Sequence, residues 1–192
     1  MRDCTQFYID GQWVDPVTEN TVAVENPATE ETIGHISFGT AGDVDKAVAA
    51  ARRAFESFSQ TSKEERLTLL RAIQAEIENR KEELATTVSD EMGAPLSLAN
   101  GPHVGLLSGH CQKAIEILEG FAFERQDGPT LHMWEPVGVV GMITPWNWPL
   151  NQIACKVFPA LATGNTMVLK PSEIAPFNAY IFAEIMHAAG VP

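Results

Sequence analysis

The chain has 192 residues, of which 45% are hydrophobic and 20% are charged, and this composition is typical of one globular domain or of one domain with an appendage. Its net charge of -12 argues against a nucleic-acid partner, because the field of an acidic protein repels polyanions. No run approaches the roughly 18 consecutive apolar residues that cross a membrane. The first residues also lack the apolar core of a signal peptide. We therefore expect a cytoplasmic protein without a membrane partner.

The cysteines and histidines show no spacing that predicts a metal site. Cys4, Cys111 and Cys155 are odd in number and far apart, which argues against a disulfide framework or a zinc site and favours a reducing compartment. The histidines form no ligand pattern either, and they are His35, His103, His110, His132 and His187. We therefore predict that no metal is bound.

The first 40 residues predict short strands that form an arm on a larger body. Phe7 to Ile9 and Trp13-Val14 flank Asp10-Gly11, a pattern typical of a hairpin. After a break at Asn26-Pro27, Thr32 to Ser37 predicts a further strand.

Four helices are then expected. Thr40 caps a helix that runs to about Phe58, and Ser62 with Glu65 forms the capping box of the next one. A third helix spans Lys81 to Met92 and stops at Gly93, and a fourth follows Pro95. The apolar stripes of these helices are interpreted as core, and they contain Val44, Val48, Ala51, Phe55, Leu67, Leu70, Ile73, Ile77, Val104, Leu107, Ile115 and Leu118.

The segment from Phe121 to Glu135 predicts a hairpin that turns at Asp127-Gly128. It could project to a partner subunit, or it could be an ordinary surface hairpin. The remaining pattern is strand, helix, strand, helix, which predicts a βαβα unit with parallel strands. Its elements are expected at Val137–Ile143, Leu150–Leu161, Thr166–Leu169 and Ala175–Ala189. The first strand is apolar throughout, as in a strand that is covered on both faces.

Polar and aromatic clusters follow both of these strands. The first strand leads into Thr144-Pro145-Trp146-Asn147, and the second leads into Lys170-Pro171-Ser172-Glu173. Ligands of open parallel sheets lie beyond the carboxyl ends of the strands, so we expect one ligand to contact both clusters.

Each polar residue of these clusters has two interpretations. Asn147 could be a buried amide donor for a developing oxyanion, or it could serve its own turn. Lys170 could bind ribose hydroxyls or a phosphate, and Glu173 could accept a hydrogen bond from a ribose 2′-hydroxyl. Alternatively, Ser172 and Glu173 could form a solvated helix cap. Neither of the standard glycine-rich phosphate loops is present.

Cys155 is a candidate nucleophile in the middle of a predicted helix. A core cysteine is the commoner explanation at such a position. Lys156 follows it directly and is expected to face another direction on the helix.

Several motifs together resemble the aldehyde dehydrogenase superfamily over essentially the whole chain. They are Glu135-Pro136 with Gly138-Val139-Val140-Gly141, Pro145-Trp146-Asn147, Pro159-Ala160-Leu161-Ala162 with Gly164-Asn165-Thr166, and Lys170-Pro171-Ser172-Glu173. The resemblance implies an α/β fold with a Rossmann-type parallel sheet and helices on both of its faces. Residues 1–120 would form an N-terminal β arm and helices, 121–136 a projecting oligomerisation hairpin, and 137–192 the first βαβα part of the dinucleotide-binding domain.

The resemblance also assigns expected roles to the two clusters. Ile143, Thr144, Pro145 and Trp146 would line the nicotinamide side of the cofactor, and Asn147 would match the amide of the oxyanion hole. Lys170, Ser172 and Glu173 would bind the adenine ribose. A carboxylate at Glu173 would repel a 2′-phosphate, so NAD is expected, with NADP possible.

The implied activity is NAD(P)-dependent oxidation of an aldehyde to a carboxylic acid by a homo-oligomer, a dimer or a tetramer. In the family, the nucleophilic cysteine and the general-base glutamate lie further along the chain than residue 192. The resemblance therefore implies a truncated, amino-terminal portion that is inactive alone. The alternatives are a non-catalytic nucleotide-binding or oligomerisation module, and a minimal enzyme that uses Cys155 as its nucleophile.

Overall fold

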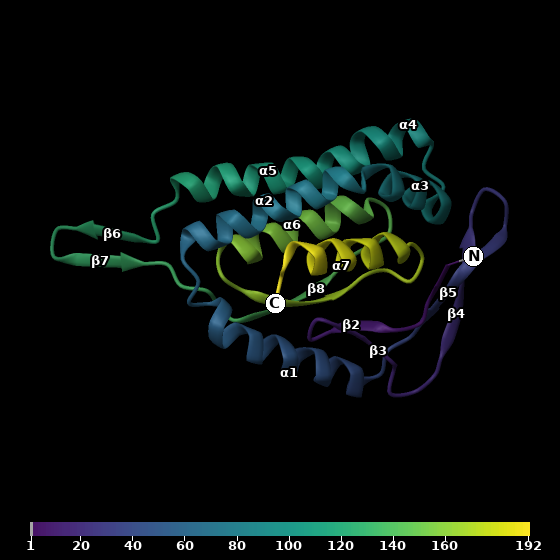
Figure 1. Cartoon of the computed structure of the whole chain (residues 1–192), viewed down its shortest axis with the longest axis horizontal. Helices are drawn as coiled ribbons and strands as arrows, with labels where there is room; N and C mark the ends of the chain where they lie inside the picture. Colours follow the sequence, from purple (N-terminus) through teal and green to yellow (C-terminus); the bar gives the residue numbers. More distant parts are fainter. Residues whose placement is uncertain (1) are drawn as a thin grey trace.

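The structure is a computed structural model, and it describes residues 2–192. A two-stranded parallel sheet lies between helix α1 and helix α6, and helices α2, α5 and α7 complete the layer on the α6 side (Figure 1). These elements are β8 (Val139–Ile143), β9 (Thr166–Lys170), α1 (Ala41–Phe58), α6 (Pro149–Ala162), α2 (Lys63–Asn79), α5 (Val104–Gly120) and α7 (Phe177–Ala189).

The N-terminal arm consists of two small sheets. Strands β1 (Arg2–Cys4), β5 (Glu31–Ser37) and β4 (Thr21–Asn26) form one sheet in the order β1-β5-β4. Strands β2 (Phe7–Ile9) and β3 (Gln12–Val14) form the predicted hairpin, which is confirmed. The hairpin packs on α7, where the rings of Trp13 and Tyr180 are stacked with their centroids 5.5 Å apart. Strands β1 and β4 were not predicted from the sequence.

The capping residue predicted for α2 is confirmed. The Ser62 hydroxyl accepts a hydrogen bond from the Glu65 N–H at 3.2 Å, and the Glu65 carboxylate accepts one from the Ser62 N–H at 2.7 Å. Thr40 starts α1 in the same way, because its N–H donates to the Asp43 carboxylate at 2.8 Å. Helix α3 (Lys81–Met92) ends at Gly93, whose φ of 76° is left-handed, as expected of a glycine that ends a helix.

The fourth predicted helix is interrupted at its start. A short helix α4 (Leu96–Leu98) leads into one wide turn η1 (Ala99–His103), and α5 follows. Pro102 lies inside this wide turn. Proline has no N–H to donate to the preceding turn, and a π-type turn accommodates that loss.

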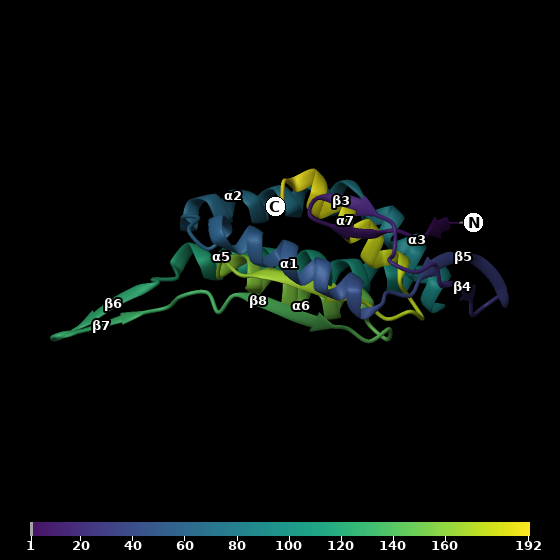
Figure 2. The same ribbon diagram turned by 90° about the horizontal axis from the view of Figure 1, so that it is seen from below.

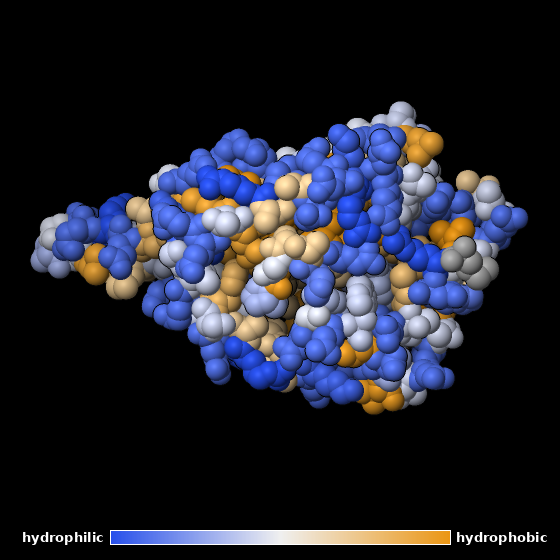
Figure 3. Space-filling model, viewed as in Figure 1, coloured by the Kyte–Doolittle hydropathy of each residue, from blue (hydrophilic) through white to orange (hydrophobic). Residues whose placement is uncertain are grey.

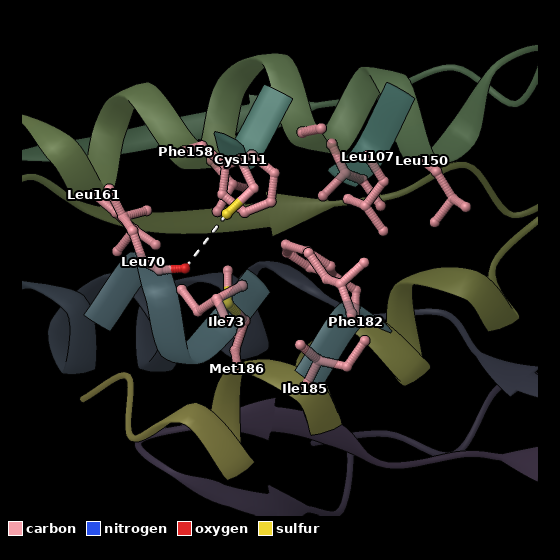
Figure 4. Close-up of a cluster of buried hydrophobic side chains, with 14 of the residues drawn as sticks. Leu70, Ile73, Leu107, Cys111, Leu150, Phe158, Leu161, Phe182, Ile185 and Met186 are labelled. Carbon is pink, nitrogen blue, oxygen red and sulfur yellow. Dashed lines mark hydrogen bonds between the residues drawn. The ribbon is translucent and has the colours of Figure 1, made fainter. Parts of the chain in front are cut away.

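The main core lies where α2, α5, α6 and α7 meet (Figure 4). Leu70, Ile73 and Leu107 are fully buried there, and the Cys111 thiol donates a hydrogen bond to the Leu70 carbonyl at 3.5 Å. The core predicted for the stripes of α2 and α5 is confirmed. The stripe predicted for α1 is partly wrong, because Val44 is 54% exposed and Val48 is 37% exposed. Ala51 of that stripe is buried as predicted, and α1 also buries Ala50 and Phe58.

The predicted parallel βαβα unit is confirmed, since β8 pairs in parallel with β9 and Ile143 lies opposite Lys170. The expectation that the first strand is covered on both faces is wrong. Ile143 is 78% exposed, and Val137, which precedes the strand, is 88% exposed. Within residues 2–192 this sheet has only two strands, so each of them has an outer edge without a neighbouring strand.

An apolar groove of about 520 Å³ follows the outer edge of β9. Consecutive residues from Asn165 to Glu173 line it, as expected of a groove along a strand edge. Its walls come from α1, α6, α7 and the β2–β3 hairpin, with the last residues of the chain at one side. They include Val44, Ala51, Phe58, Val157, Phe182 and Met186. Figure 3 shows a hollow with hydrophobic and weakly hydrophobic residues around it in the middle of this face.

The hairpin of β6 (Glu124–Asp127) and β7 (Thr130–Met133) projects away from the body of the molecule (Figures 1 and 2). It turns at Gly128, whose φ is 57°. Leu131, Met133 and Trp134 are between 45% and 57% exposed, so the hairpin presents apolar side chains to its surroundings.

A buried guanidinium lies at the base of this hairpin. Arg66 is 7% exposed, and it donates hydrogen bonds to the carbonyl oxygens of Thr61 and Ser59 at 2.7 and 3.2 Å. It also lies 5.5 Å from the centre of the Phe123 ring, a cation–π distance. Gly164 approaches the same guanidinium so closely that a Cβ there would lie 2.7 Å from Nη2.

Two further properties concern the whole of the described chain. None of the helices within residues 2–192 has the length and apolarity needed to cross a membrane. In that same part of the molecule, no three His, Cys, Asp or Glu side chains are grouped so that they could hold a metal ion.

Candidate functional site

The two clusters that follow the parallel strands lie side by side. The Thr144 N–H donates a hydrogen bond to the Lys170 carbonyl at 3.2 Å, directly beyond the last pair of the β8–β9 ladder. The predicted juxtaposition of the clusters at one edge of the sheet is therefore confirmed.

The second cluster presents a linked pair of charges to solvent. The Lys170 ammonium donates to the Glu173 carboxylate at 2.8 Å, and both side chains are well exposed. This hydrogen bond from Lys170 holds the pKa of Glu173 below its ordinary value. The pair offers hydrogen-bond donors and acceptors next to each other, as recognition of a hydroxyl-rich ligand requires.

Ser172 lies beneath this pair and is 9% exposed. Its hydroxyl accepts a hydrogen bond from the Ile174 N–H at 3.2 Å, which closes a small turn inside the loop. The helix-cap interpretation of Ser172 and Glu173 is wrong, because α7 begins only at Phe177 and its first amides are bound by another residue, Glu91.

The first cluster forms the turn between β8 and α6. Thr144 is buried, whereas Pro145, Trp146 and Asn147 are exposed. The expectation that Asn147 is a buried donor is therefore wrong for this chain, since none of the described residues covers the turn. Asn147 makes no side-chain hydrogen bond within residues 2–192, which leaves its amide free to bind a ligand and does not support a role in its own turn.

A stacked aromatic pair supports this turn from behind. The ring of His103 is stacked on the ring of Trp148, with centroids 4.2 Å apart and planes 16° from parallel. His103 is fully buried, and burial lowers its pKa. Nearby, His110 Nε2 and Asn151 Oδ1 are 2.9 Å apart, which joins α5 to α6. Neither pair was predicted from the sequence, because the spacing of the histidines was compared only with that of metal ligands. The one hint was Trp148, a large ring that needs a packing partner.

Cys155 does not lie in the core. It is exposed, because α6 packs inward through Ile153, Ala154 and Val157 and turns residue 155 outward. The expectation that Lys156 faces away is also wrong, since its long side chain bends back and its Nζ lies 3.7 Å from the Cys155 sulfur. Its ammonium mainly donates to the Gln152 carbonyl at 3.0 Å.

Parallel strands joined by a helix define an α/β protein, and ligands of such proteins lie at the carboxyl ends of the strands, where the two polar clusters stand. The model of the aldehyde dehydrogenase family matches residues 13–192, and the chain therefore belongs to that family. The expected α/β fold and the family resemblance are both confirmed.

Several known proteins are similar to this chain. A 3-succinoylsemialdehyde-pyridine dehydrogenase of a Pseudomonas species is 54% identical, and the match covers 100% of this chain and 40% of that protein. The structure of a Bartonella henselae aldehyde dehydrogenase matches with a TM-score of 0.97 and 43% identity, over 100% of this chain and 41% of the other. A mutant aldehyde dehydrogenase C of Pseudomonas syringae, solved with NAD+ and octanal, matches with a TM-score of 0.97 and 49% identity, over 98% of this chain and 39% of that one. The chain thus spans about 40% of the length of the curated relatives that it matches.

Proposed function

We propose that this chain is the amino-terminal portion of an NAD-dependent aldehyde dehydrogenase, whose complete form oxidises an aldehyde to a carboxylic acid. The observation that carries the proposal is the adjacency of the Thr144–Asn147 turn and the Lys170–Glu173 loop, in a chain of this family. The similar Pseudomonas syringae enzyme, solved with NAD+ and octanal, supports it.

The residues at the edge of the sheet fit the cofactor in chemical type. Lys170 supplies donors and Glu173 supplies an acceptor for ribose hydroxyls, and the small turn at Ser172 fixes the loop between them. The carboxylate of Glu173 disfavours a 2′-phosphate, so NAD is preferred to NADP. The exposed Ile143 and the residues Thr144, Pro145 and Trp146 form a surface against which a flat nicotinamide ring can pack. NAD supplies the hydride acceptor of the reaction when it is bound.

Asn147 is the catalytic residue that we assign to this chain. Its free amide lies at the same edge of the sheet, where it can donate a hydrogen bond to the aldehyde oxygen. Negative charge develops on this oxygen when the carbonyl carbon is attacked, and a fixed donor stabilises the transition state more than the substrate. The attacking thiol and the base come, in this proposal, from polypeptide that corresponds to the remainder of the relatives.

The apolar groove supports the proposal that further polypeptide packs on this chain and supplies the thiol and the base. The outer edge of β9 has unpaired backbone groups beside the apolar groove of about 520 Å³. Such an edge readily accepts another strand. We infer that a strand of the remaining polypeptide pairs there and covers Val44 and Leu169. Lys170 and Glu173 would then lie at the carboxyl edge of a wider sheet.

A second candidate function is an oligomerisation module. The projecting β6–β7 hairpin exposes Leu131, Met133 and Trp134, and this favours a homo-oligomer in which the hairpin contacts a second subunit.

The three free cysteines favour a reducing, cytoplasmic location.

The test measures NADH formation and NAD affinity separately. We expect no NADH from the 192-residue chain with NAD and an aldehyde such as octanal. We expect activity when the part of the Bartonella henselae enzyme that follows the matched region is added. In that mixture, Asn147→Ala should lower kcat by about 100-fold or more and leave the Kd for NAD unchanged. Glu173→Ala should weaken NAD binding instead, and the exposed Glu82→Gln should change neither. NADH formed by the chain alone would overturn the assignment and point to a thiol of this chain.

A further inference from the structure

A buried carboxylate on α3 is directed at the start of α7. Glu91 is 1% exposed, and its two carboxylate oxygens accept hydrogen bonds from three donors. These donors are the backbone N–H of Phe177, the backbone N–H of Asn178 at 3.0 Å and the side-chain amide of Asn178 at 2.6 Å. Glu91 is thus bound to a segment that lies more than 80 residues further along the chain.

Helix α7 has no cap of its own. Its N-cap position is Pro176, whose side chain has no group that can accept a hydrogen bond, and no local side chain caps the helix. The first amides of a helix point along its axis without intrahelical partners, and they favour a negative charge. The Glu91 carboxylate accepts hydrogen bonds from the first amides of α7 and places a negative charge at the start of the helix. An acidic residue of α3 thus provides the cap that the sequence around α7 lacks.

The same contact extends into the loop that precedes α7. The side-chain amide of Asn178 also donates to the Ala175 carbonyl at 2.8 Å, so Glu91, Asn178 and the loop form one hydrogen-bonded series. At the other end of the loop, Lys170 is fixed to the sheet by the Thr144 hydrogen bond. The segment from Pro171 to Pro176, which carries Ser172 and Glu173, is therefore held at both ends.

We propose that Glu91 is a positioning residue for this loop. It does not contact the ligand; by binding the first turn of α7 it fixes where Glu173 stands relative to Lys170. The proposal rests on the proposed function in one respect, namely that the loop binds the ribose of NAD. The holding of the loop by Glu91 is a property of the chain alone and can be measured without any ligand.

Amide hydrogen exchange of the 192-residue chain tests the holding of the loop. In Glu91→Gln, one of the two acceptor oxygens becomes an amide nitrogen that faces N–H donors. We therefore expect the hydrogen-bonded amides of Ile174, Phe177 and Asn178 to lose protection by about 10- to 100-fold, the effect of losing a hydrogen bond to a charged group. Amides in α5 should keep their protection. Glu82→Gln, an exposed glutamate on the same helix, serves as the matched control and should change nothing.

Three results would overturn the proposal: unchanged protection at Ile174, Phe177 and Asn178, loss of protection spread evenly over the chain, or the same loss in Glu82→Gln. If Glu91→Gln does not fold, Glu91→Asp keeps the charge and shortens the reach, and the same local loss of protection is expected from it.

NAD titration of the same variants links the loop to the site. If the wild-type chain binds NAD, Glu91→Gln should raise the Kd by about 10-fold or more, and Glu82→Gln should leave it unchanged. An equal Kd in wild type and Glu91→Gln would overturn the positioning role. If no variant binds NAD, including wild type, the cofactor assignment of the loop fails for this chain, whereas hydrogen exchange still decides whether Glu91 holds the loop.

Discussion

The rings of His103 and Trp148 lie face to face, 4.2 Å apart, although His103 comes from a wide turn before α5 and Trp148 stands at the start of α6. Neither ring nitrogen of His103 has a hydrogen-bond partner within residues 2–192. The imidazole therefore contributes here as a flat surface. Through Trp148, the residue directly before α6, it fixes the turn that carries Asn147.

Replacing this histidine by a larger apolar ring should preserve the stack. His103→Phe removes two buried polar atoms without partners, each of which costs free energy when buried. We expect the free energy of unfolding to rise by about 1 kcal/mol in urea titrations at pH 7. Since burial lowers the pKa of His103, its stabilising contribution is complete above its ordinary pKa and is lost as the pH falls. His103→Phe should therefore also reduce the loss of stability in acid. A marked loss of stability at pH 7, absent from His132→Phe on the hairpin, would show that the imidazole nitrogens are needed.

The stabilising contribution of Glu91 should fall as the pH rises, opposite to that of His103. Burial raises its pKa from 4.5 to about 7, against the lowering effect of the hydrogen bonds from Asn178 and Phe177 and of the nearby positive charge of Arg2. A raised carboxyl pKa means that the contribution is complete below pH 4.5 and is lost as the pH rises to about 7. The loss amounts to something on the order of 3 kcal/mol. Denaturant titrations between pH 4.5 and 8 should show this fall in wild type and a flatter profile in Glu91→Gln. Parallel profiles would contradict the assignment.

Gly164 should tolerate no side chain. Its φ is 78°, and a Cβ there would lie 2.7 Å from the Arg66 guanidinium, so Gly164→Ala combines backbone strain with a steric clash. We expect a loss of about 2 to 4 kcal/mol in the free energy of unfolding. Gly105→Ala on α5 is the matched control. A Cβ there meets nothing within 4 Å, and alanine favours the helix by up to about 1 kcal/mol. Equal effects at the two sites would contradict the predicted clash.

The three thiols should differ sharply in reactivity. Cys155 is exposed, whereas burial raises the pKa of Cys4 to about 11 and that of Cys111 to about 12. Iodoacetamide reacts with the thiolate, so at pH 8 the native chain should be alkylated at Cys155 first and at Cys111 last. Mass spectrometry of digested protein measures the order. In denaturant all three should react at similar rates, and rapid labelling of Cys111 in the native chain would show that the core opens.

Charged substitutions on the β6–β7 hairpin should lower the molecular mass of the protein in solution. If Leu131 and Met133 contact a second subunit, Leu131→Asp with Met133→Asp places two charges in an apolar contact and should convert the oligomer into monomers. Light scattering after size exclusion gives the mass. Val17→Asp, an exposed valine in the N-terminal arm, controls for added charge. An oligomer that persists in the double variant would place the interface elsewhere, with the outer edge of β9 as the next candidate.

The sequence predicted the elements that depend on local signals. Ser62 with Glu65, Gly93 and Asp10-Gly11 specify a cap, a helix end and a turn through their own chemistry, and all three stand where expected. The pairing of the two strand ends was also predictable, because a helix that connects adjacent strands leaves them parallel.

What failed depends on contacts between distant segments. The exposure of Ile143, Val44 and Asn147 follows from how many strands and loops surround them, which no local pattern reports. The contact of Glu91 with α7 was invisible for the same reason, because it joins residues that share no spacing. Cys155 was misplaced because the apolar run of α6 did not show which of its faces packs inward.

The buried guanidinium of Arg66 has a consequence for how the molecule can move. It is bonded to the end of α1, stacks on Phe123 at the foot of the hairpin, and touches the Gly164 turn that leads into β9. Three segments remote in sequence thus share one rigid planar group. A displacement of the hairpin is therefore passed to the start of β9, the strand that ends in Lys170, through this side chain as well as through the hydrogen bond from the Gly138 N–H to Asn165.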